Sequence, residues 1–122
     1  MINKRVLITG VGAISAAGIN VAETMASFRR GLRNAGNLTL FETSLEYPVF
    51  EVKGLPEKYN LEGRRTAGLA LCAVEEALID AGLVSRELAE IRVGVCMGTT
   101  VASQLNDLDF YKSFRETGMA PL

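Results

Sequence analysis

Apolar residues form two short runs that glycine interrupts. The first covers residues 4–15, where Val6, Leu7 and Ile8 precede Gly10 and Gly12. The second covers residues 91–98 and is again apolar and interrupted by glycine. Runs of β-forming residues without a polar side are typical of strands buried on both faces. The pattern therefore predicts two buried, mainly parallel strands, at about residues 4–15 and 91–98.

Apolar residues at helical spacing predict three helices, at about residues 20–32, 64–82 and 103–116. Asn20 is followed three residues later by Glu23, a pairing typical of a helix N-terminus. Gly31 and Gly82 stand where the first two helices should end, as glycine commonly does. Strands packed by helices predict an α/β fold.

The helix expected at residues 64–82 has the clearest pattern. A wide apolar stripe should face the core, and Glu75, Glu76 and Asp80 should lie on its other side. Residues 85–90 are polar and are expected to form a connector. Residues 34–60 mix turn-forming and apolar positions without a clear period, and indicate a surface excursion.

Composition narrows the class of protein. The 122 residues are 48% hydrophobic and 22% charged, with a formal net charge of −1, which suits one globular domain or a piece of a larger one. The charge balance disfavours nucleic acid as a partner. No apolar run has the length of a membrane span, and the N-terminus lacks the apolar core of a signal peptide. We therefore expect a cytoplasmic protein.

The chain has no histidine and two cysteines, Cys72 and Cys96. Two cysteines make neither a disulfide framework nor a zinc site. Without histidine, neither thiol has the usual base beside it. We expect both cysteines to be structural, no catalytic residue within this chain, and no metal or cofactor.

Two other features have a functional interpretation beside a structural one. Gly10–Ser15 partly fits the glycine pattern of a dinucleotide-binding loop, but the helical pattern begins only near Asn20, which is too distant for that motif. Arg64 and Arg65 precede a helix whose N-terminal dipole disfavours cations. They are either solvated or face an acidic partner or a phosphate.

Several blocks resemble the β-ketoacyl-acyl carrier protein synthases. The opening Arg5-Val6-x-Ile8-Thr9-Gly10-x-Gly12 resembles the first strand of that family, and Phe41-Glu42-Thr43-Ser44 resembles its Phe-Asp-x-Ser segment. Residues 70–83 and 92–99 resemble a helix of the family and the strand and turn after it. The blocks keep the family's order along nearly the whole chain. Residues 16–17 and 99–103 depart from the family pattern, which leaves the subfamily and its acyl-chain preference open.

The resemblance implies an incomplete half of a thiolase-like fold, with residues 1–122 as a single partial domain. In that family an acyl group moves to a cysteine, a malonyl thioester loses CO₂, and the resulting carbanion attacks the acyl group. The nucleophilic cysteine and the catalytic histidines match no position here. The resemblance thus implies an N-terminal synthase segment that is inactive alone, in fatty acid or polyketide synthesis.

The resemblance also implies partners. These are an acyl carrier protein, which Arg64 and Arg65 would meet, and either the remainder of the synthase or a second copy in a homodimer. The alternative functions are a non-catalytic carrier-protein-binding module and a dinucleotide-binding domain that uses Gly10–Ser15.

Overall fold

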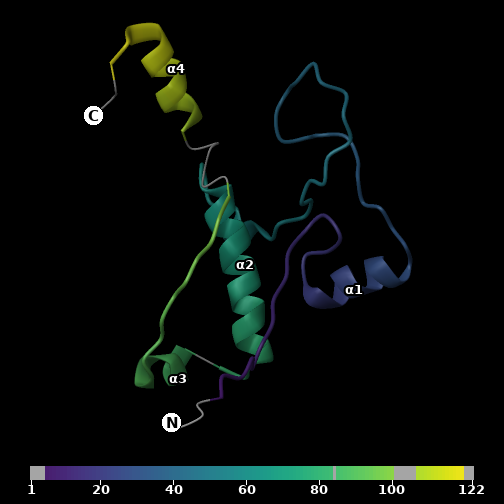
Figure 1. Cartoon of the computed structure of the whole chain (residues 1–122), viewed down its shortest axis with the longest axis vertical. Helices are drawn as coiled ribbons and strands as arrows, with labels where there is room; N and C mark the ends of the chain where they lie inside the picture. Colours follow the sequence, from purple (N-terminus) through teal and green to yellow (C-terminus); the bar gives the residue numbers. More distant parts are fainter. Residues whose placement is uncertain (1–4, 84, 101–106, 120–122) are drawn as a thin grey trace.

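The computed structural model describes residues 5–83, 85–100 and 107–119 (Figure 1). Within these ranges the chain forms four α-helices and one short 3₁₀ helix. In chain order they are α1 (Val21–Arg29), η1 (Glu57–Tyr59), α2 (Arg65–Asp80), α3 (Ser85–Glu90) and α4 (Leu108–Thr117). The long helix α2 occupies the centre of the molecule, and α1 and α4 lie apart from it (Figure 1).

The prediction of an α/β fold with buried parallel strands is wrong for the described residues. They contain no sheet, and pairing is limited to isolated bridges between Ser15 and Gly18 and between Gly36 and Val49. Residues 5–14 and 91–98 are extended but unpaired with each other. The side chains of Val6 and Val95 are 93% and 82% exposed. A strand needs a neighbour for its backbone groups, and a local apolar run does not supply one.

The predicted helix at residues 20–32 is confirmed in outline by α1. The Asn20 side chain accepts a hydrogen bond from Glu23 N–H at 2.7 Å and caps the first turn. At the other end, Gly31 adopts φ +64°. The N–H groups of Gly31 and Leu32 then bond back to Phe28 and Ser27, which is a Schellman ending.

The predicted helix at residues 64–82 is confirmed by α2, which ends in the same way at Gly82, with φ +69°. Two segments pack tightly on it. A Cβ added at Gly10 or Gly12 would overlap the carbonyl oxygens of Ala77 and Ala73, so the Gly-rich segment lies directly on the helix backbone. On an earlier turn, Gly68 is buried against the Tyr59 carbonyl of η1.

The C-terminal third differs from expectation in one helix and agrees in another. Residues 85–90, expected as a connector, form α3. α4 begins at Leu108 within the predicted range of 103–116 and ends one residue beyond it; the predicted start at 103–106 lies outside the described residues. Aromatic contacts link Phe110 with Tyr111 and Phe114 along α4.

Candidate functional site

The two arginines predicted to dock a partner stand side by side at the start of α2, but their surroundings differ. Arg64 is the N-cap residue, makes no side-chain capping bond and is exposed. Arg65 is half-buried, and its guanidinium donates a hydrogen bond to the Val52 carbonyl. Arg65 therefore connects α2 to the segment of residues 34–60, and Arg64 is the cation that is more exposed to a partner.

A shallow cleft of about 370 Å³ opens beside this end of α2. Its lining includes Glu51, Lys53 and Arg65. Glu51 accepts hydrogen bonds from the Thr39 hydroxyl and N–H, both at 2.6 Å. These bonds, and to a smaller extent the charges of Lys53 and Arg65, lower the pKa of Glu51. The cleft thus carries two cations beside one ionised carboxylate.

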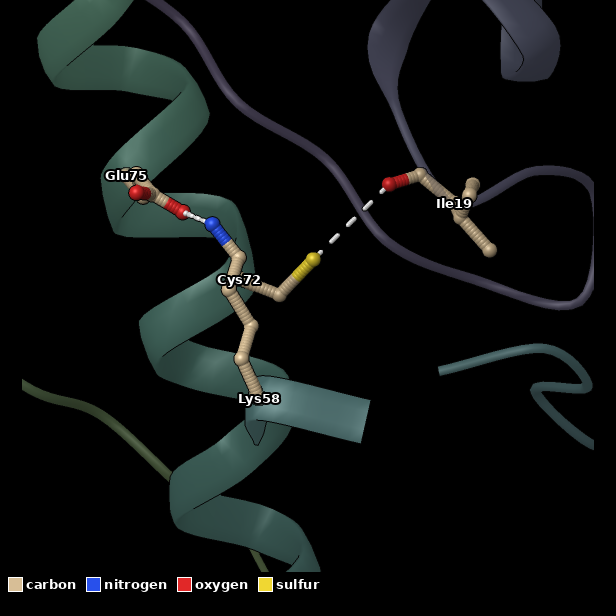
Figure 2. A network of polar contacts seen from close by, with 4 residues as sticks. All are labelled: Ile19, Lys58, Cys72 and Glu75. Atoms are coloured by element: carbon tan, nitrogen blue, oxygen red, sulfur yellow. Dashed lines mark hydrogen bonds and ion pairs between the residues drawn. The ribbon is translucent and has the colours of Figure 1, made fainter. Parts of the chain in front are cut away.

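The first cysteine is held in the interior. Cys72 is 8% exposed, and its Sγ lies 3.9 Å from the carbonyl oxygen of Ile19 (Figure 2). The neighbouring polar contact, an ion pair of 2.5 Å between Lys58 and Glu75, lies on another side of α2 and does not include the thiol (Figure 2). Cys72 is therefore a packing residue, as expected.

The second cysteine, Cys96, is exposed on the extended segment of residues 91–98. The described residues contain no group of three His, Cys, Asp or Glu side chains that could hold a metal ion. Because the sequence has no histidine, neither thiol has a histidine neighbour that would activate it.

The Gly10–Ser15 segment does not have the geometry of a dinucleotide loop. Its amides at Val11 and Ala13 donate to the carboxylates of Asp80 and Glu76, at 3.0 and 2.9 Å. Helix α1 begins at Val21, beyond the turn at Ser15–Gly18. A pyrophosphate would meet two carboxylates instead of free amides and a helix N-terminus. The geometry disfavours the dinucleotide hypothesis, which a dinucleotide titration can test.

The role of Glu76 and Asp80 differs from the prediction. Both were expected on the solvent side of α2; Asp80 is exposed and Glu76 is half-buried, and both accept hydrogen bonds from the Gly-rich segment, which also lies close to Ala73, Ala77 and Ala81. The sequence contains a signal for this arrangement, because residues three and four apart share one face of a helix. The amides that donate to these carboxylates lie more than sixty positions away in the sequence, so a local pattern cannot indicate them.

Comparisons with known proteins point to one family. The family described as "Beta-ketoacyl synthase, N-terminal domain" matches residues 51–120. The chain is 32% identical over 106 residues to 3-oxoacyl-[acyl-carrier-protein] synthase 2 of Synechocystis sp., covering 80% of this chain and 26% of that protein. It is 31% identical over 109 residues to the Staphylococcus aureus (strain COL) protein of the same name, covering 81% and 26%.

The chain thus spans about a quarter of the length of these curated relatives. No solved structure matches it. In the described part of the chain, no helix is long and apolar enough to cross a membrane.

Proposed function

The chain belongs to the β-ketoacyl synthase family, and from this premise we propose that it is the N-terminal part of a β-ketoacyl-acyl carrier protein synthase. Residues 1–122 then form a partial domain that supplies framework, and the groups that react lie outside it. The reaction of the whole protein would be the decarboxylative condensation of an acyl thioester with a malonyl thioester. The match to synthases of which this chain covers only a quarter is the observation that carries the proposal.

The exposed surface supports a partial domain. The chain exposes 10717 Å² at a mass of 13.1 kDa. A compact monomer of this mass exposes about 6,400 Å². Apolar side chains contribute to this surface: Val6, Ile8 and Val95 are each more than 80% exposed. Apolar surface of this extent normally marks an interface, and here we assign it to the remainder of the synthase.

The surroundings of the thiols support the proposal that the chain alone is inactive. Condensation in this family needs an activated thiolate and donors for the developing negative charge. Cys72 is buried against a backbone carbonyl, and the sequence has no histidine to act on either cysteine.

A condensation assay tests this proposal. The purified chain, given acyl and malonyl thioesters of acyl carrier protein, should release no CO₂ and form no β-ketoacyl product. The Cys72→Ser/Cys96→Ser double variant is the matched control. Turnover by the chain, whether or not it survives in that variant, would show that the reacting groups lie within it.

A docking role is the second candidate, and the exposure of Arg64 favours it. In this hypothesis the chain meets an acidic acyl carrier protein in the cytoplasm, and Arg64 steers the encounter. Arg64→Glu should weaken carrier binding several-fold at low salt, whereas Arg92→Glu, also an exposed arginine, should leave it unchanged. Equal affinities for the two variants in a calorimetric titration would exclude docking at Arg64.

A further inference from the structure

Three backbone amides near the N-terminus have side-chain acceptors on one helix. Asp80 Oδ2 accepts from Val11 N–H at 3.0 Å, and Glu76 Oε2 accepts from Ala13 N–H at 2.9 Å. Glu76 Oε1 accepts from Val21 N–H at 2.8 Å. A carboxylate of α2 therefore accepts a hydrogen bond from each of these amides, at ordinary N–H···O distances.

The arrangement resembles one edge of a strand. In an extended segment, residues two apart present their N–H groups to the same side, as Val11 and Ala13 do here. On α2, residues four apart share a face, as Glu76 and Asp80 do. The side of the Gly-rich segment that a neighbouring strand would cover is thus covered by two carboxylates.

Glu76 has the larger role of the two. Its oxygens bind amides on either side of the Ser15–Gly18 turn, so one side chain joins α2, the Gly-rich segment and the first residue of α1. Both of these bonds are partly buried, whereas the Asp80 bond is exposed. A partly buried amide without an acceptor is destabilising, and hydrogen bonds to charged groups are stronger than neutral ones.

We propose that Glu76 and Asp80 form a carboxylate clip that holds the Gly-rich segment on α2 and sets the position of α1. The clip takes the place of a strand neighbour for the Val11 and Ala13 amides. Other contacts between α1 and α2 do not replace it: no close backbone approach joins these two helices in the described residues. Loss of Glu76 should therefore loosen the turn and the start of α1 together, with the 3.9 Å contact between Cys72 Sγ and the Ile19 carbonyl left in place, while α2 keeps its own hydrogen bonds.

Amide exchange of the 122-residue chain, followed by NMR, tests the clip. In Glu76→Ala, exchange at Ala13 and Val21 should be at least tenfold faster than in the unsubstituted chain. Asp80→Ala should accelerate Val11 by a smaller factor. Glu75→Ala, which removes the neighbouring carboxylate that pairs with Lys58, is the matched control and should change none of the three amides.

The outcomes separate the clip from general destabilisation. Unchanged exchange at Ala13 and Val21 in Glu76→Ala would overturn the proposal, as would an equal effect of Glu75→Ala. If Glu76→Ala also accelerates amides within α2, the milder Glu76→Gln decides, because its amide oxygen remains an acceptor. Acceleration confined to Ala13 and Val21 in that variant supports the clip, and equal acceleration throughout the chain overturns it.

Discussion

The two glycine-interrupted apolar segments have similar sequences and opposite surroundings. Residues 5–14 run onto α2, where Gly10 and Gly12 touch its backbone. Residues 91–98 run from α3 toward α4 (Figure 1), and an added Cβ at Gly94 or Gly98 would meet nothing within 4 Å. An apolar run with glycines therefore specifies an extended chain, and a second element decides whether that chain is packed.

The difference lies in what the neighbouring element offers. α2 presents small alanines that allow close approach, and carboxylates that accept the amides of Val11 and Ala13. Within the described residues, 91–98 form no β-bridge, and Val95 stays 82% exposed. Apolar surface left in water contributes nothing to stability, so the second segment gains little from its apolar side chains in this structure.

The largest expected difference between the two segments appears when one methyl group is added to a glycine in each. Gly12→Ala should lower the free energy of unfolding by about 1–3 kcal/mol, because its Cβ would overlap the Ala73 carbonyl. Gly94→Ala should leave the free energy unchanged or raise it by up to about 1 kcal/mol, because the methyl group has open space. Urea unfolding of both variants measures the difference. Equal destabilisation would show that the segments do not differ in packing.

The reaction rates of the two cysteines measure the same difference in packing between the segments, without any change in the stability of the fold. Cys96 on the exposed segment should react with a thiol reagent at least about tenfold faster than Cys72, which is buried against Ile19. Absorbance of the released chromophore, with the Cys72→Ser and Cys96→Ser variants to assign each phase, gives the two rates. Comparable rates would mean that the segment around Ile19 does not cover Cys72 in solution.

A polar substitution on the exposed segment should have a small effect on folding. Val95→Ser should change the free energy of unfolding by less than about 0.5 kcal/mol, because the side chain is already in water. It should also reduce self-association, because it removes an apolar side chain from an unpaired extended edge. Sedimentation at several concentrations measures association. A large loss of stability would reveal a packed environment for Val95.

The smallest effect concerns the hydrogen bonds from Thr39 to the Glu51 carboxylate, which lie outside both apolar segments. Because hydrogen bonding lowers the pKa of Glu51 in the fold, this contact contributes fully above the unfolded pKa and is lost as pH falls through the lower folded pKa. The Thr39 amide resonance should therefore move with a midpoint below the ordinary pKa of glutamate. In Thr39→Val, Glu51 should titrate closer to its ordinary pKa. A Glu51 titration that is unchanged in that variant would contradict the assigned cause.

The parts of the fold that depend on neighbouring residues could be predicted from the sequence. The cap at Asn20, the helices α1 and α2 and their glycine endings all follow from contacts within a few residues. The prediction failed where structure depends on distant residues. Strand assignments at 4–15 and 91–98 needed partners that local apolar runs do not specify, and α3 forms from a short polar stretch without an apolar period.

The docking role of Arg64 and Arg65 stays a prediction. Position alone indicated Arg64 and Arg65, but their difference arises from the Val52 carbonyl, which reaches Arg65 through the fold. Glu76 and Asp80 were expected to face solvent, because charge was taken as a sign of exposure; Asp80 is exposed, whereas Glu76 is half-buried beneath the Gly-rich segment. In this molecule the two carboxylates accept hydrogen bonds from backbone amides that are far away in the sequence.

The close fit of the Gly-rich segment to α2 also constrains how many residues this segment can contain. An extended chain advances about 3.3 Å per residue and a helix about 1.5 Å, so two residues of one match four of the other to within about 0.6 Å. The contacts follow this spacing. Gly12 lies against the Ala73 carbonyl and Gly10 against the Ala77 carbonyl. The Ala13 amide bonds to Glu76 and the Val11 amide to Asp80. One residue inserted between Gly10 and Gly12 would put a side chain where only glycine fits, so length variation should concentrate after Ser15, where the alignment ends in a turn.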